Sequence, residues 1–287
     1  MIGILLAVIV AILWAFGEIS YSSMSKKYDR TNIYMYTFLV RAFFYLGVVL
    51  IFHRSLFGTL DFEVMSSMLP IIFCDLFASL IINVAVYNGK LSVVSPIMAA
   101  YPILDISLGN LFLKENVSLA ENILVLLICL SIVVLATNQK SDAKAPHPVK
   151  GIIFSIMYMF LVAFSTYFEK SIYNHSYTVY DLYYYKGAIY AMATIFFAGV
   201  ILITPTKMRR PNWSILKGCG LTPIGNVLYS FALSIGNMTL VAPISSLYSC
   251  GTTFLSRLFL KEKLHRIERV CIYTILACTF LLILLKL

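Results

Sequence analysis

Apolar stretches of about 20 residues recur along the chain between short polar segments, and this pattern constrains the fold more than any other feature. A helix needs about 20 mostly apolar residues to cross the hydrocarbon core of a bilayer. Ten stretches meet this length, and we predict membrane helices over residues 2–24, 31–52, 67–88, 92–113, 117–136, 150–173, 180–204, 214–236, 239–260 and 266–286. The fold class expected is therefore an all-α integral membrane protein.

The composition excludes a water-soluble enzyme. The chain is 60% hydrophobic and 12% charged, whereas soluble domains are roughly 25% charged. Fifteen of its 22 Lys and Arg residues fall in the odd-numbered loops between the predicted helices. The positive-inside rule accounts for them without nucleic acid and places both termini outside the cytoplasm. We expect no cofactor and no metal, because the six cysteines lack ligand spacing and no catalytic or phosphate-binding motif occurs.

The two halves of the chain repeat each other. The sequence LFLKE occurs at 111–115 and again at 258–262, a spacing of 147, and Pro96 and Pro243 share that spacing. LWAF at 13–16 matches LVAF at 161–164 at a spacing of 148. We predict a first five-helix repeat over 1–137, a polar linker over 138–149 and a second repeat over 150–287. Five helices per repeat would invert the second half relative to the first, as in many secondary transporters. A duplicated structural bundle is the alternative.

Two long segments carry a family resemblance. VVSPIMAAYPILDISLGNLFLKE, from Val93, and LVAPISSLYSCGTTFLSRLFLKE, from Leu240, resemble the recurring pattern of the drug/metabolite transporter superfamily, EamA type. The first predicted helix, with Trp14, also resembles that of the family. The resemblance covers essentially the whole chain. It implies a ten-helix carrier of small metabolites in a cell membrane, which we expect to be the bacterial cytoplasmic (inner) membrane.

Charged residues inside the apolar stretches are candidates for function, because each costs roughly 2.5–3.5 kcal/mol at the bilayer centre. Four lie well inside predicted helices: Glu18, Arg41, Asp75 and Asp105. Others lie nearer predicted helix ends, and we expect their side chains to extend to the membrane surface: Glu169, Lys170, Asp181, Lys186 and Arg257.

Glu18 shares a helix face with Trp14 and Tyr21. An acid flanked by aromatic rings suits an organic cation. Burial disfavours the charged form of a carboxyl, so Glu18 could hold either a proton or a cationic substrate and couple their movements. The surrounding string GEISYSS is similar to the first helix of the small multidrug resistance proteins, which implies the same role. The alternative is that Glu18 forms a structural ion pair with Arg41.

Further pocket residues follow from the repeat and from helical spacing. Tyr101 and Tyr248 are equivalent, so we expect them to face each other across a central pocket, the alternative being ordinary packing. Either aspartate could neutralise Arg41. The prolines near the starts of the fourth and ninth helices are not expected to break them, and kinks are expected at Pro102 and Pro223. The predicted substrate-binding residues are Glu18, Trp14, Tyr21, Tyr101, Asp105, Tyr248, Asp75, Asn83 and Tyr184, with Arg41 as a charge-pairing residue.

These features predict a secondary active transporter of a small organic cation or amine that works by alternating access, with protons as a possible coupling ion. The alternative is an exporter or importer of neutral amino acids or aromatic metabolites, in which Glu18 and Asp105 engage an amine and Arg41 a carboxylate. A channel would need rings of like charge, and an intramembrane enzyme would need a nucleophile and a base. We expect a monomer within the lipid bilayer, with a dimer as the alternative.

Overall fold

The computed structural model describes residues 2–25, 27–57, 61–113, 118–137, 146–175, 177–204, 213–236, 238–262 and 264–286. Regular structure in these residues is entirely helical, which confirms the all-α prediction for them. The helices are α1 (Ile2–Ser25), α2 (Arg30–Phe52), the short 3-10 helix η1 (Arg54–Leu56), α3 (Phe62–Asn88), α4 (Leu91–Met98), α5 (Pro102–Leu113), α6 (Leu119–Thr137), α7 (Pro148–Asn174), α8 (Val179–Ile203), α9 (Trp213–Ile235), α10 (Met238–Ser246), α11 (Tyr248–Phe259) and α12 (Arg266–Lys286).

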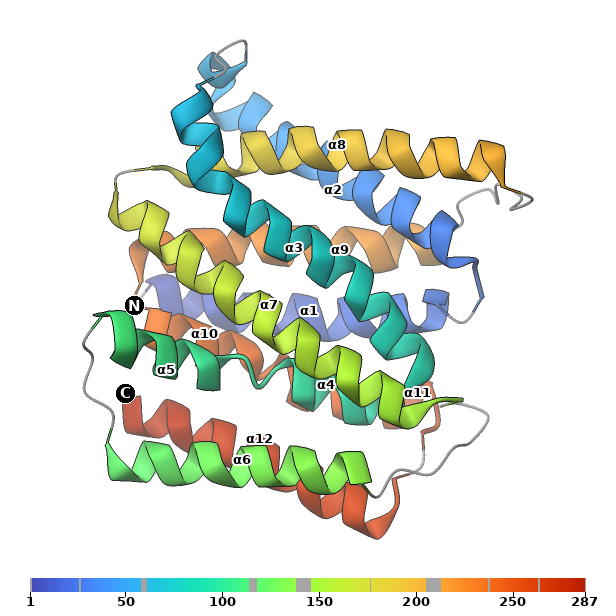
Figure 1. The fold of residues 1–287 in the computed structure, drawn as a ribbon, viewed down its shortest axis with the longest axis vertical. Helices are drawn as coiled ribbons and strands as arrows, with labels where there is room; N and C mark the ends of the chain where they lie inside the picture. Colours follow the sequence, from blue (N-terminus) through green and yellow to red (C-terminus); the bar gives the residue numbers. More distant parts are fainter. Residues whose placement is uncertain are drawn as a thin grey trace.

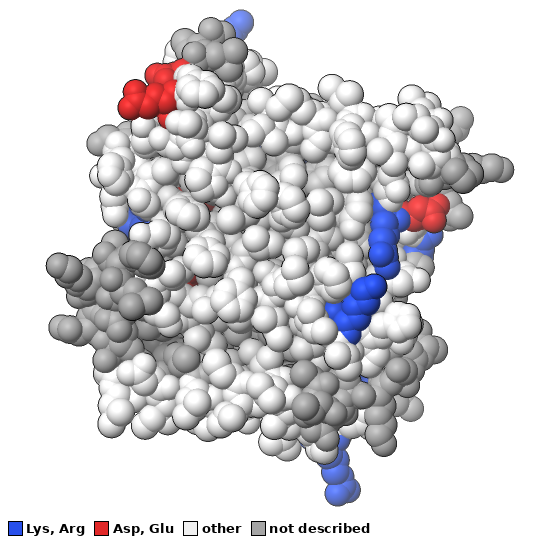
Figure 2. Space-filling view, in the orientation of Figure 1, with Lys and Arg blue, Asp and Glu red and all other residues white. Residues whose placement is uncertain are grey.

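Five helices are long and apolar enough to cross a membrane: α1, α2, α3, α7 and α8. Large apolar side chains cover their outer surfaces, such as Phe43, 77% exposed, and Ile195, 72% exposed. Figure 2 shows one broad face that is uncharged across its middle, with most of its visible Lys and Arg side chains at the right edge. An apolar belt of this kind is stable in lipid and unstable in water, so the protein is a multi-pass integral membrane protein.

Successive long helices run in opposite directions across the molecule (Figure 1). Helix α1 starts on the left of the view and α7 starts on the right, while the N- and C-termini both lie on the left. The main helix pairs are α1 with α9, α3 with α7, α2 with α8 and α6 with α12. If the two halves of the chain are exchanged, α1 with α9 becomes α7 with α3, and the other two pairs map onto themselves.

The two crossing pairs also share their small residues. At the α1–α9 crossing, a Cβ on Gly3 would lie 3.3 Å from the Ala232 carbonyl oxygen and 3.5 Å from the Gly236 Cα. At the α3–α7 crossing, a Cβ on Gly151 would lie 3.2 Å from the Ala85 carbonyl oxygen and 2.7 Å from the Gly89 Cα. All three contact positions match between the halves at spacings of 147 or 148. Small residues let the helix backbones approach closely in both places.

The fourth and ninth predicted helices are each interrupted, so the prediction that they are unbroken is wrong. The first divides into α4 and α5 around Ala99–Tyr101, and the second divides into α10 and α11 at Leu247. Pro102 has no N–H to continue the ladder, and its predicted kink lies at this first break. At the second break the Leu247 N–H bonds three residues back, to Ile244. Helix α9, in contrast, continues through Pro223.

Candidate functional site

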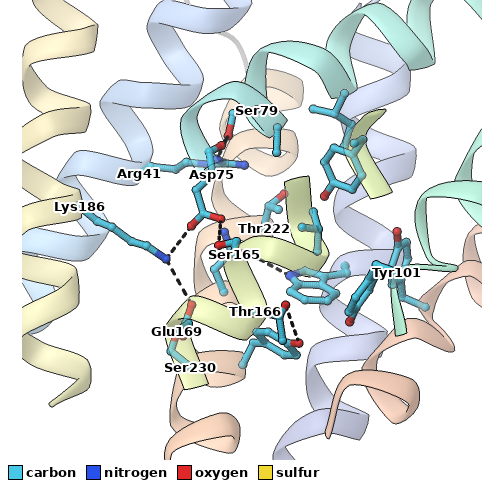
Figure 3. A pocket seen from close by; sticks show the side chains of 18 of the residues that line it. Arg41, Asp75, Ser79, Tyr101, Ser165, Thr166, Glu169, Lys186, Thr222 and Ser230 are labelled. Carbon is cyan, nitrogen blue, oxygen red and sulfur yellow. Dashed lines mark hydrogen bonds and ion pairs between the residues drawn. The ribbon is translucent and has the colours of Figure 1, made fainter. Parts of the chain in front are cut away.

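A cavity enclosing about 950 Å³ lies among α1, α2, α3, α7, α8, α9 and the two helix breaks. Its walls carry ionisable, hydroxyl and aromatic side chains (Figure 3). The lining residues are Trp14, Glu18, Tyr21, Arg41, Asp75, Ala78, Ser79, Ile82, Tyr101, Tyr158, Val162, Ser165, Thr166, Glu169, Tyr183, Lys186, Thr222, Asn226, Tyr229, Ser230 and Tyr248. The size suits a small-molecule ligand, since such pockets span roughly 300–1,000 Å³.

Both halves of the chain contribute the same positions to this cavity. Helices α1 and α7 match at a spacing of 148, and α3 and α9, which end at residues 88 and 235, match at 147. At these spacings seven pairs of equivalent residues line the cavity: Trp14 and Val162, Glu18 and Thr166, Tyr21 and Glu169, Asp75 and Thr222, Ser79 and Asn226, Ile82 and Tyr229, and Tyr101 and Tyr248. The cavity therefore lies at the interface between the two repeats.

One wall of the cavity carries a cluster of ion pairs. The Lys186 Nζ lies 2.6 Å from Asp75 Oδ2 and 3.5 Å from Glu169 Oε2, joining α8 to α3 and α7 (Figure 3). Ser165 donates a hydrogen bond to Asp75 Oδ1 at 2.6 Å, and Tyr173 donates one to Glu169 at 2.9 Å. Charges in an apolar interior are stable when they are paired and hydrogen-bonded in this way.

The expectation that Lys186 and Glu169 reach the membrane surface is wrong, because their side chains are only 3% and 5% exposed. Lys170, by comparison, donates hydrogen bonds to the carbonyl oxygens of Leu233 and Gly236 at the end of α9. Asp181 forms a capping box with Thr178 at the start of α8. Sequence position alone did not separate the buried charges of α7 and α8 from these terminal ones.

Arg41 has no carboxylate partner among the described residues. Its Nη1 donates to the Ser79 hydroxyl, and its guanidinium carbon lies 5.8 Å from the centre of the Tyr190 ring. The buried Nε has no hydrogen-bond partner in the described part of the chain. An ion pair between Arg41 and Glu18 is not formed in this structure, and Asp75, one of the two aspartates considered for Arg41, pairs with Lys186 instead.

Glu18 lies on the opposite, aromatic wall. Its Oε2 accepts a hydrogen bond of 2.5 Å from the Ser95 hydroxyl, and it forms no ion pair among the described residues. Trp14, one turn earlier, packs edge-on against Tyr248 with ring centres 5.6 Å apart and lies 5.2 Å from the ring of Tyr229. An acid without a basic partner among aromatic rings is a favourable environment for an organic cation.

The cavity brings together seven of the ten residues singled out from the sequence: Trp14, Glu18, Tyr21, Arg41, Asp75, Tyr101 and Tyr248. The other three lie outside its lining. Asn83 is buried and lies 3.5 Å from the Tyr21 hydroxyl. Tyr184 packs against Phe57 and Tyr185. Asp105 is 1% exposed on α5, a helix that packs against α7 and α10.

Sequence reasoning missed most of the second half of the cavity. Lys186, Glu169, Tyr158, Asn226 and Tyr229 all line it. The repeat spacing could have found three of them, because Tyr21 corresponds to Glu169, Ser79 to Asn226 and Ile82 to Tyr229. Within the described residues no group of three or more His, Cys, Asp or Glu could hold a metal ion.

Comparison with known proteins agrees with this architecture. The model of the EamA-like transporter family matches residues 1–137 and 149–284. An uncharacterized protein of Methanocaldococcus jannaschii is 33% identical over 79 residues, which are 28% of this chain and 54% of that protein. The chain thus matches about half the length of that relative. A protein of known crystal structure has the same fold, with a TM-score of 0.67, 12% identity, and coverage of 99% of this chain and 98% of that one.

A helical membrane protein with a cavity between two sequence repeats has the architecture of a carrier. The family match extends over nearly the whole chain in two segments. The chain belongs to the EamA-like transporter family, and the resemblance seen in the sequence is confirmed.

Proposed function

We propose that the protein is a secondary active transporter that moves a small amine-bearing or cationic metabolite by alternating access. In this proposal ten membrane spans form two inverted five-helix repeats, residues 1–137 and 150–287, joined by the linker 138–149. The broken segments α4–α5 and α10–α11 each count as one span. The repeats rock about the central cavity and open it to one side of the membrane at a time.

The observation that carries this proposal is the lining of the cavity by seven pairs of equivalent residues. A cavity at a repeat interface can be closed on either side by the same motion carried out by opposite halves. The opposite starting sides of α1 and α7 in Figure 1 also favour inverted repeats. The termini lie at the end away from the basic edge of Figure 2, which favours termini outside the cytoplasm, in a bacterial inner membrane.

The charges that line the cavity favour a cationic substrate. Three carboxyl groups line it, from Glu18, Asp75 and Glu169, against two basic groups, from Arg41 and Lys186. Lys186 is held between Asp75 and Glu169, so Glu18 is the acid left to attract a ligand. We propose that a protonated amine binds at Glu18 and that its apolar part packs between Trp14 and the tyrosine rings.

Arg41 supports a second candidate, a zwitterionic substrate such as a neutral or aromatic amino acid. Its Nε has no partner among the described residues, so the guanidinium could receive a ligand carboxylate while Glu18 holds the amine. Quaternary ammonium compounds separate the two candidates. They inhibit a carrier that needs only the cation, and they do not inhibit one that needs both charged ends.

A thermal-shift screen of the purified protein tests the substrate site, because a ligand that binds the folded state raises its apparent stability. Tetraethylammonium, primary amines and amino acids are compared on the wild type, on Glu18→Gln and on the matched control Glu63→Gln, at an exposed position near the start of α3. We expect cations to stabilise the wild type and Glu63→Gln, and not Glu18→Gln. Equal stabilisation of all three proteins would contradict the role of Glu18.

Proton coupling at Glu18 needs a separate measurement. We propose that this carboxyl binds a proton and the substrate in turn, so that one is released when the other binds. Uptake of tetraethylammonium into proteoliposomes is measured with and without an imposed pH gradient. We expect the gradient to drive uptake by the wild type and by Glu63→Gln. If Glu18→Gln still responded to the gradient, the coupling role would be lost.

A further inference from the structure

Asp105 differs from every other buried carboxyl that the structure describes. It is 1% exposed, and both of its carboxyl oxygens are buried without a hydrogen-bond partner. The other buried acids have partners: Glu18 bonds to Ser95, Glu169 pairs with Lys186, Glu262 accepts the N–H groups of Leu91 and Ser92, and Glu268 pairs with Lys90.

The helices around Asp105 offer no counter-charge. Helix α5 packs mainly on α10 and α7. Helix α10 has no titratable residue, and those of α7 are Lys150, Tyr158, Tyr167, Glu169, Lys170 and Tyr173. Lys150 is exposed and lies near the first turn, while Lys170 is bonded to the end of α9. Across the cavity the Tyr101 and Tyr229 hydroxyls interact electrostatically with Asp105 without hydrogen-bonding to it.

An ionised carboxylate in this position would be costly, because an isolated charge in an apolar medium loses its hydration and gains nothing in return. The neutral acid loses far less, on the order of 1–3 kcal/mol for a buried polar group without a partner. The proton is therefore the one ligand that this position requires.

The repeat shows that packing alone does not call for an acid here. Asp105 corresponds to Thr252 at the spacing of 147, and Thr252 is also fully buried, with a hydroxyl that has no partner among the described residues. A small neutral side chain thus fills the equivalent position in the second half. The carboxyl differs from it chiefly in being able to give up a proton.

We propose that Asp105 is a second proton-binding residue, separate from the substrate cavity, that holds a proton in this conformation and releases it when α5 moves away from α7 and α10. The release rests on the alternating access proposed above. The step is a simple exchange with water, in which the carboxyl O–H bond breaks and the proton passes to a water molecule. The break between α4 and α5 gives α5 a point about which to move.

Infrared spectroscopy tests the bound proton without any substrate. The full chain is reconstituted in vesicles of phosphatidylethanolamine and phosphatidylglycerol at neutral pH, and the carbonyl band of protonated carboxylic acids is recorded in H₂O and D₂O. We expect Asp105→Asn to delete one band that Asp181→Asn, at an exposed helix cap, leaves in place. Labelling the aspartate carboxyls with ¹³C should shift the same band in the unmutated protein, so the result does not depend on how Asp105→Asn folds.

A spectrum unchanged by Asp105→Asn, or a protonated-acid band that ¹³C-aspartate does not shift, would overturn the proposal. The release step is tested by tetraethylammonium uptake under a pH gradient. We expect Asp105→Asn to lose the response to the gradient and Asp181→Asn to keep it, and an unchanged response of Asp105→Asn would overturn the release. If the wild type takes up no tetraethylammonium, the proposed function fails while the infrared result on Asp105 stands.

Discussion

The two halves of the cavity wall share their positions and differ in their chemistry. Glu18 and Trp14 on α1 correspond to Thr166 and Val162 on α7, whereas Tyr21 corresponds to the acid Glu169. The glycines that set the helix crossings are the same in both halves. The backbone contacts have thus kept the symmetry that two interchangeable gates need, while the side chains have become a single asymmetric binding site.

The largest effect is expected where the second half carries its ion pairs. Replacing Lys186 by Met leaves Asp75 and Glu169 buried without their base, and removing one partner of a buried ion pair costs about 3–5 kcal/mol. We expect a large drop in the thermal unfolding temperature of the purified protein. The control Lys150→Met, at an exposed position, should unfold like the wild type. Equal unfolding temperatures for the two variants would show that the cluster contributes little.

Moving the acid from one wall to the other tests whether the asymmetry belongs to the site or to the repeat. Glu18→Thr removes the unpaired carboxyl, and loss of a buried charged contact weakens binding by about 2–5 kcal/mol. We expect tetraethylammonium to stop stabilising this variant in the thermal-shift assay. Adding Thr166→Glu places a carboxyl at the equivalent position on α7 and should restore part of the shift.

The control for that exchange is Thr166→Gln in the Glu18→Thr background, which has nearly the same side-chain size without the charge. Restoration by Gln as well as by Glu would mean that the cavity responds to volume and not to charge.

The glycine crossings test how alike the two halves are in packing. A Cβ on Gly151 would meet the Gly89 Cα at 2.7 Å, whereas the nearest atom to a Cβ on Gly3 is the Ala232 oxygen at 3.3 Å. Overpacking a close contact costs about 1–3 kcal/mol, so we expect Gly151→Ala to destabilise more than Gly3→Ala. Gly47→Ala is the matched control, since no atom lies within 4 Å of a Cβ there. A Gly3→Ala variant less stable than Gly151→Ala would reverse the ranking.

The sequence was sufficient for the helical class, the family and much of the first half of the cavity, because apolar length and repeated motifs are local signals. Glu18 was found as an acid inside an apolar stretch. Lys186 was misplaced because only its distance from a helix end is visible along the chain. Its partners, Asp75 and Glu169, come from other helices, and only the packing of α3, α7 and α8 brings them within reach.

The helix breaks and the location of Asp105 were missed for a related reason. Hydrophobicity reports which residues avoid water, and α4 and α5 are equally apolar on both sides of their break. The change in backbone hydrogen bonding around Ala99–Tyr101 leaves no mark in composition. Tyr101 and Asp105 are one turn apart in the sequence, yet only Tyr101 lines the cavity, because α7 and α10 pack on the helix that carries Asp105.

The smallest expected effect concerns a hydrogen bond that one half has and the other lacks. The Trp14 Nε1 donates to Asn226 Oδ1 at 3.0 Å. The equivalent pair is Val162 and Ser79, and valine has no group that can donate. A double-mutant cycle on Trp14→Phe and Asn226→Ala should give a coupling of about 0.5–1.5 kcal/mol in unfolding free energy.

The cycle on Val162→Ala and Ser79→Ala should give a coupling near zero, because the Ser79 hydroxyl is engaged with Arg41 and with the Asp75 carbonyl oxygen. Equal couplings in the two cycles would mean that packing, shared by both halves, accounts for the Trp14 contact. A coupling confined to Trp14 and Asn226 would mean that this hydrogen bond fixes the indole beside Glu18, and that the first half of the chain has been specialised to hold a ligand.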